Sequence, residues 1–201
     1  SVSFILEWNG LRFAFSSDTL PNKWWREHTK GVDLSIHECF VPPQFMMERY
    51  GMTPSEAIFV GTQGHTAAQA FGKIMSLTEP RRAVCYHFQN DFDTAPAVEK
   101  EIRKTYDGPL DLARDFMVWN VTREEIRTRM AVPNHDSFPA PPQRVKQPPD
   151  SMKAYKWTQF SLSGVEPDSA AVTNALIEEF NKKNGTNIKP ALTGLPFMKK
   201  Q

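Results

Sequence analysis

Apolar and polar residues alternate along much of the first part of the chain, in the pattern of short β-strands. Segments 3–7 and 11–17 alternate in this way and are separated by Asn9-Gly10, a dipeptide typical of a two-residue hairpin turn. The same alternation predicts strands at 32–38, 83–88 and 116–122. The chain is therefore predicted to open with a β-hairpin and to return to strand structure three more times.

Helical spacing of apolar residues separates these strands. A short helix is predicted at 44–51, and a longer one at 66–77 after a glycine-punctuated loop. Thr53 and Glu56 have the spacing of a capping box, and a further helix is predicted to start near Thr94. The resulting order, β-β-β-α-β-α-β, predicts the α/β fold class.

The pattern changes after residue 132. Residues 133–150 contain six prolines and are predicted to form an extended arm. One amphipathic helix follows, capped by Asp168 or Ser169 and ended by Gly185. We therefore divide the chain into residues 1–132, the α/β part, and residues 133–201, an arm and helix suited to dimerisation or to covering a pocket.

Composition narrows the function. Of 201 residues 40% are hydrophobic, which is enough for a core, and 24 basic residues balance 23 acidic ones. This balance argues against a nucleic-acid surface. No segment approaches the ~20 apolar residues of a membrane span, and no signal peptide is visible. Cys39 and Cys85 fit buried thiols in a reducing compartment, so a cytoplasmic location is expected, with a processed secreted form as the alternative.

Candidate chemistry gathers where strands end. Asp18 follows the strand 11–17, His37-Glu38 ends the strand 32–38, and His87 ends the strand 83–88, while His65 precedes a helix. Ligands of open α/β folds bind at strand ends, and histidine and aspartate are zinc ligands. Each residue alone also has a structural explanation: a turn former for Asp18, a buried hydrogen-bonded side chain for His87, and a solvated strand end for Glu38.

The order of these motifs resembles the second, C-terminal half of the metallo-β-lactamase superfamily, in its RNase Z and arylsulfatase-like branch. Ser17-Asp18-Thr19 resembles the Gly-Asp-Thr motif, with serine in place of glycine. His37-Glu38-Cys39-Phe40 resembles His-Glu-Ala-Thr, and His65-Thr66-Ala67 resembles His-Ser-Thr. The resemblance extends over residues 3–122 and implies half of an αββα sandwich.

The resemblance also implies residue roles. Asp18 is expected to bridge two metal ions and His87 to ligate the second, so the expected cofactor is one or two zinc ions. Glu38 is expected to orient His65, which protonates the leaving group. Trp24, Trp25, Phe40 and Phe92 are candidate substrate-pocket residues, with an ordinary core position as the alternative.

One signature of the superfamily is absent from the sequence. The chain has histidines only at 28, 37, 65, 87 and 135, and none forms the His-x-His-x-Asp-His motif. Either a missing N-terminal half carries that motif and acts as a partner, or the chain is a metal-free relic. The strand that begins at residue 3 without a lead-in favours the first explanation.

The resulting functional hypothesis is a zinc-dependent hydrolase that uses metal-bound hydroxide on a small organic substrate such as an ester, lactone or aryl halide. A weaker resemblance points to the small-molecule hydrolases of the guanitoxin-biosynthesis and chlorothalonil-dehalogenase types. A phosphodiesterase resembling RNase Z and a metal-free structural or assembly module are the alternatives. A homo-oligomer is expected, without nucleic-acid or membrane partners.

Overall fold

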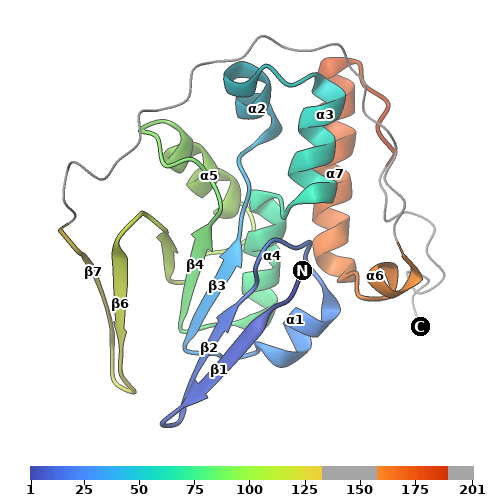
Figure 1. Cartoon of the computed structure of the whole chain (residues 1–201). Helices are drawn as coiled ribbons and strands as arrows, with labels where there is room; N and C mark the ends of the chain where they lie inside the picture. The colour runs from blue at the N-terminus through green and yellow to red at the C-terminus, as the bar shows by residue number, and fades with distance from the viewer. Residues whose placement is uncertain (133–157, 190–201) are drawn as a thin grey trace.

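The computed structural model describes residues 1–132 and 158–189, and these form a mixed α/β fold (Figure 1). The first sheet contains β1 (Phe4–Trp8), β2 (Leu11–Phe15), β3 (Leu34–Glu38), β4 (Arg82–Tyr86) and β5 (Leu110–Leu112). A separate hairpin contains β6 (Met117–Val121) and β7 (Ile126–Met130). The helices are α1 (Lys23–His28), α2 (Pro43–Tyr50), α3 (Pro54–Phe59), η1 (Val60–Gly64), α4 (Ala68–Thr78), α5 (Thr94–Ile102), α6 (Gln159–Ser163) and α7 (Pro167–Asn184).

The five-stranded sheet has the order β1-β2-β3-β4-β5. Strands β1 and β2 pair antiparallel, and β2 to β5 all run parallel. Asn9 and Gly10 close the hairpin with φ values of 50° and 75°, the left-handed backbone that a tight hairpin turn requires. Because β2, β3 and β4 are parallel, their carboxyl ends meet at one edge, where the candidate site residues are placed.

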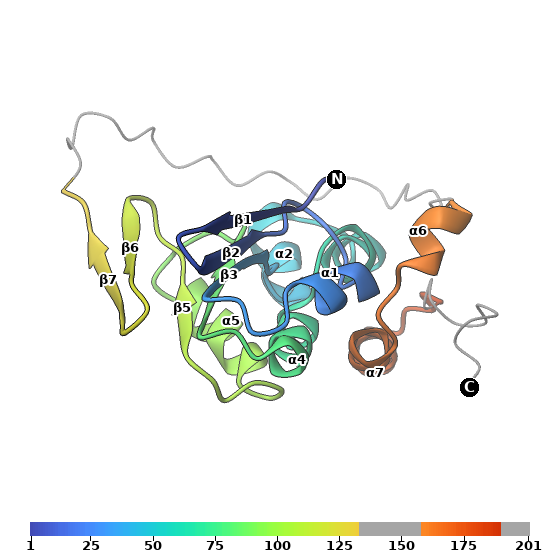
Figure 2. The ribbon, with the colours of Figure 1, turned by 90° about the horizontal axis from the view of Figure 1, so that it is seen from below.

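One face of the sheet is covered by helices. Figure 2 shows α4 and α5 on the same side of the strands. Every second strand residue faces this layer, which places Ala14, Ala83 and Cys85 in one buried cluster with Phe71 of α4 and Ile102 of α5. The close packing of these apolar side chains is the main stabilising contribution to this half of the fold.

The alternate residues of β1 and β2 face the other way and remain largely accessible. Phe4, Leu6 and Trp8 are 62%, 61% and 65% exposed, and Phe15 is 41% exposed. No helix in the described ranges covers this face, which we call the open sheet face. Exposed apolar areas on a sheet are uncommon among soluble monomers.

The C-terminal helix α7 packs on its own chain. Ile58 of α3 forms a small buried cluster with Ile177 and Phe180 of α7, and α7 also lies along α4. The helix ends at Gly185, as expected, in the left-handed conformation, but Glu166 is its cap because its carboxylate accepts from the Ser169 amide. The proline-rich arm lies outside the described residues.

Several elements differ from the sequence-based expectation. Helix α1 and strands β5 and β7 were not predicted, and residues 60–64 form a π-helix rather than a loop. The strand predicted at 116–122 exists but pairs with β7 instead of joining the main sheet. None of the helices in the described parts of the chain is both long and apolar enough to span a bilayer.

Candidate metal centre

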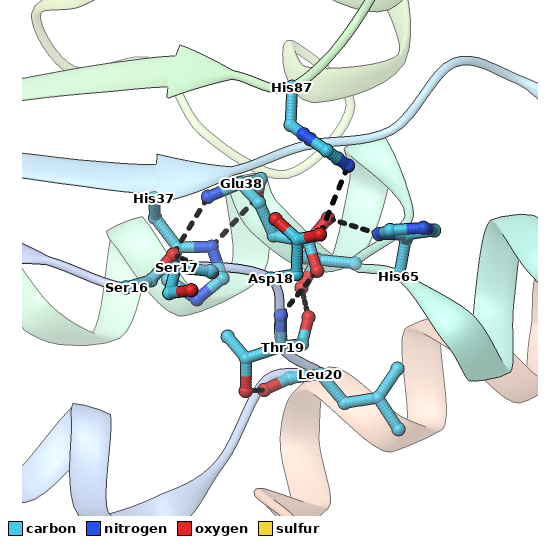
Figure 3. A network of polar contacts seen from close by, with 10 residues as sticks. Ser16, Ser17, Asp18, Thr19, Leu20, His37, Glu38, His65 and His87 are labelled. Carbon is cyan, nitrogen blue, oxygen red and sulfur yellow. Dashed lines mark hydrogen bonds and ion pairs between the residues drawn. The ribbon is translucent and has the colours of Figure 1, made fainter. Parts of the chain in front are cut away.

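The carboxyl edge of the sheet brings three candidate ligands together. Asp18, His65 and His87 each offer one ligand atom, and these atoms lie within 4.8 Å of one another. His87 Nε2 lies 3.4 Å from Asp18 Oδ2. Figure 3 shows the three side chains converging from the ends of β2 and β4 and from the start of the segment leading into α4. We call Asp18, His65 and His87 the ligand cluster.

The backbone that carries Asp18 is left-handed at the preceding residue. Ser17 has a φ of 55°, a region that non-glycine residues adopt at a cost because of their β-carbon. The Ser16 hydroxyl stabilises the turn because it donates to the Ser17 carbonyl at 2.7 Å and accepts from the Glu38 amide at 3.0 Å. This conformation explains why glycine suits the position in the motif that Ser17-Asp18-Thr19 resembles.

His87 has the second left-handed backbone of the site. It follows β4 directly with a φ of 73°, which ends the strand and turns the chain away from the sheet. Left-handed residues other than glycine cluster at functional sites, where the surrounding structure holds them in place. His87 is exposed, and its ring lies near that of His65, with centroids 4.9 Å apart.

Glu38 links the turn of Asp18 to the ring of His65 (Figure 3). Its side chain is fully buried, and its two oxygens have different partners. Oε1 accepts from the Thr19 amide at 2.6 Å, and Oε2 lies 2.9 Å from His65 Nδ1. Thr66 adds a further link, since its hydroxyl donates to the Thr19 carbonyl at 2.7 Å. One carboxylate therefore fixes both the turn of Asp18 and the ring of His65.

The surroundings of His65 change its pKa in two directions. Partial burial acts to lower the pKa, but the hydrogen bond and negative charge of Glu38, with the charge of Asp18, outweigh it and raise the pKa above its ordinary value. Phe40 stacks on the His65 ring with centroids 4.2 Å apart and planes 9° from parallel. The ring is thus fixed by a carboxylate at its edge and an aromatic ring on its face.

The π-helix η1 positions His65 along the chain. The His65 amide donates to the Val60 carbonyl at 3.0 Å, the five-residue bond that defines this kind of helix. Such short π-helical segments are rare and occur frequently at functional sites. The Val60–Gly64 sequence gives no periodic signal that distinguishes it from a loop, and only the pair of glycines marks it as unusual.

The expected pocket residues have different outcomes. Phe40 lies against the ligand cluster, while Trp24 and Trp25 line a cavity that begins beside Asp18. Phe92 is not among the residues that line this cavity, and its side chain is 91% exposed. It lies in a loop whose aspartates, Asp91 and Asp93, pair with Arg49 of α2, so this loop turns toward α2.

The donor set of the cluster fits a borderline metal ion such as zinc. Imidazole nitrogen and carboxylate oxygen are the donors that catalytic zinc sites use. Glu38 behind His65 matches the common arrangement in which a carboxylate orients a histidine of a metal site. Three donors leave part of a four-coordinate sphere for other ligands.

Comparison with solved structures finds chains of similar fold. No family model matches the chain, and no curated protein matches it. The chain is similar to the metallo-beta-lactamase fold protein YhfI from Bacillus subtilis, with 16% identity and a TM-score of 0.43. The match covers 56% of this chain and 41% of that one, so this chain spans less than half of the length of that protein. A likeness at this level decides neither family nor activity.

The strain at Ser17 gives a first prediction. Ser17→Gly should raise the free energy of unfolding by about 0.5–1 kcal/mol, because glycine adopts the left-handed backbone without a β-carbon clash. Ser17→Val should lower it by at least about 1 kcal/mol, because branching at the β-carbon increases that clash. Urea-induced unfolding measures both. Ser76→Gly within α4 is the control and should lose about 1 kcal/mol of stability; an equal loss in Ser17→Gly contradicts the prediction.

The buried His37 gives a second prediction. Burial lowers the pKa of His37 to about 4, against the opposing hydrogen bond to the Glu38 carbonyl. The unfolded chain binds this proton near pH 6.5, so His37 does not affect stability above that pH, and stability falls as the pH drops from about 6.5 to about 4, by up to about 3 kcal/mol.

The test of this second prediction compares urea unfolding at about pH 7.5 and about pH 4.5. His37→Asn keeps a donor for the Glu38 carbonyl but has no titrating ring, so it should lose less stability between the two pH values than the unsubstituted chain. Equal losses in the two proteins contradict the assignment of this pH dependence to His37.

Proposed function

We propose that the chain is the C-terminal half domain of a zinc-dependent hydrolase of metallo-β-lactamase type that acts on a small organic substrate. The observation that carries the proposal is the convergence of Asp18, His65 and His87 within 4.8 Å, with Glu38 bonded to His65. The sequence order of these residues matches the motif order of that superfamily. Isolated surface histidines and acids show neither this convergence nor a buried carboxylate behind them.

Asp18 and His87 are the residues that hold the metal in this proposal. When bound, zinc supplies a Lewis acid that polarises the scissile bond and lowers the pKa of a coordinated water. Asp18 is the more accessible of the two and is 52% exposed at its side chain, whereas His87 is 35% exposed. The half-exposed carboxylate leaves one side open to substrate or to further ligands.

His65 holds and delivers a proton in the proposed reaction. The Glu38 carboxylate accepts a hydrogen bond from His65 Nδ1–H. The other ring nitrogen, Nε2, is then the one that exchanges a proton with the leaving group. The raised pKa of His65 favours the charged ring that can donate this proton. The alternative assignment for His65 is a third metal ligand, since it belongs to the same cluster.

We further propose that a partner β-layer, carrying the His-x-His-x-Asp-His motif, completes the coordination and sits on the open sheet face. The exposed apolar side chains of Phe4, Leu6 and Trp8 favour such a layer, because burying them removes a large apolar area from water. The same face also favours the second candidate function, a metal-free assembly module. Metal uptake separates the two.

Zinc binding tests the assignment of the ligands. The purified chain, with its partner where one co-purifies, should take up zinc in a competition titration with a coloured chelator. Asp18→Asn and His87→Ala should each weaken uptake at least about tenfold, because loss of a direct ligand costs no less than loss of an outer-shell partner. Asp107→Asn, at an exposed aspartate remote from the cluster, is the matched control. Uptake that is unaffected by both cluster substitutions rejects the site.

The roles of Glu38 and His65 are tested on the zinc-loaded protein. Glu38→Gln and His65→Ala should lower turnover about 100-fold for a substrate with a poor, alkoxide leaving group, because proton delivery is lost. The loss should be much smaller for a 4-nitrophenyl ester, whose leaving group departs without protonation. Zinc uptake should remain. Equal losses on both substrates, or loss of zinc in His65→Ala, reject proton delivery and support the ligand assignment.

A further inference from the structure

A cavity of about 680 Å³ begins beside the ligand cluster and leads away from it. Asp18 and Thr19 line it at one end, and Gly64 lines it on the side of the segment that carries His65. The other lining residues come from β1 and the residues before it, from α1 and the residues that flank it, from Phe59 of α3 and Gln63 of η1, and from α6 and the α6–α7 connection. Figure 1 shows where these elements lie. Its volume lies in the range of small-molecule sites.

The wall opposite the sheet is held firmly in place by α1. The Lys23 amide donates to the Gly164 carbonyl at 2.6 Å, and Arg26 pairs with the fully buried carboxylate of Glu166 at 2.8 Å. Gly164 lies directly against the Trp24 ring, since a β-carbon there would be 2.0 Å from a ring atom. The cavity is therefore a built feature that depends on a glycine at this position.

Aromatic side chains form one part of its lining, beside polar side chains such as Asn22 and Gln63. Trp24 and Phe160 stack with centroids 5.1 Å apart and planes 21° from parallel, and Trp25 and Phe59 also line the cavity. Flat aromatic walls favour flat aromatic ligands, which can add to an offset stack. No lysine or arginine belongs to the described lining, where His28 is the one basic side chain, and Asp18 places a negative charge at its end. A compact anionic group is therefore disfavoured inside the cavity.

We propose that this cavity binds the non-reacting part of the substrate, and that this part is an uncharged aryl group stacked against Trp24 and Phe160. The inference rests on the proposed function, because only a hydrolase substrate has a scissile bond. That bond would lie at the Asp18 end of the cavity. It narrows the substrate class to aryl-bearing compounds whose anionic or hydrolysable group stays outside the aromatic walls. Binding of the aryl group itself requires no metal.

Binding of indole to the metal-free chain tests the proposal. Indole is an uncharged bicyclic aryl compound, and indoxyl sulfate is its anionic counterpart. Ligand-observed NMR titration should show saturable indole binding at least about fivefold tighter than binding of indoxyl sulfate or hexanol. Trp24→Ala and Phe160→Ala should each weaken indole binding at least about fivefold. Phe160 is 74% exposed, so its substitution tests the stack with little effect on folding.

Trp8→Ala is the matched control, because Trp8 is 65% exposed on the open sheet face and lies outside the cavity. It should leave indole affinity unchanged. Absence of saturable binding, equal affinity for indoxyl sulfate, or equal weakening by Trp8→Ala overturns the proposal. These results are independent of zinc uptake. If the chain takes up zinc but does not bind indole, only the aryl cavity is rejected. If it binds indole but does not take up zinc, only the hydrolase is rejected.

Discussion

The carboxylate of Glu38 is the group on which the arrangement of the site depends. A buried charge is costly unless strong hydrogen bonds compensate it, and Glu38 has two at 2.6 and 2.9 Å, from the Thr19 amide and His65. Both partners belong to segments far apart in sequence, the turn after β2 and the segment after η1. Because the same carboxylate satisfies both, moving either segment leaves a buried charge short of a partner. The positions of Asp18 and His65 are therefore coupled through one side chain that is fully buried.

The backbone around the site departs from regular structure in three places. Ser17 and His87 adopt left-handed conformations, and η1 inserts a π-helical turn before His65. Each departure costs conformational energy, and each directs one member of the ligand cluster toward the others. Parallel strands alone would bring residues 17, 38 and 87 to the same edge of the sheet, but would not aim their side chains at a common point. The irregular backbone orients the three side chains toward one another. The packing of the sheet against the helices offsets the conformational energy that this backbone costs.

The sequence predicts the α/β class because its strand and helix periods are clear in the segments that pack against the core. The hairpin at Asn9-Gly10 and the capping box at Thr53 follow from local chemistry and are present in the structure. Strand β5 was missed because it has only three residues, and β7 was missed because it is largely exposed and carries two arginines. Phe92 was expected in the pocket because it is an aromatic residue near the candidate site in sequence, but it is 91% exposed and its neighbouring aspartates pair with Arg49 of α2. The order of Asp18, Glu38, His65 and His87 along the chain was enough to predict that they form one site. The left-handed turns that orient them depend on tertiary contacts and leave no periodic signal in the sequence.

Two surfaces of opposite character meet at the ligand cluster. On one side the open sheet face exposes large apolar side chains without concavity, which suits an extended layer of another polypeptide. On the other side the cavity between α1 and α6 is concave and aromatic, which suits a small molecule. Asp18 lies at the boundary and is half-exposed, so its carboxylate can be approached from both. A metal held by Asp18 and His87 in this position would receive its remaining protein ligands from the side of the sheet face and its substrate from the side of the cavity. The partner layer and the substrate would then approach the metal from different sides. If both used the same opening, they would compete for it.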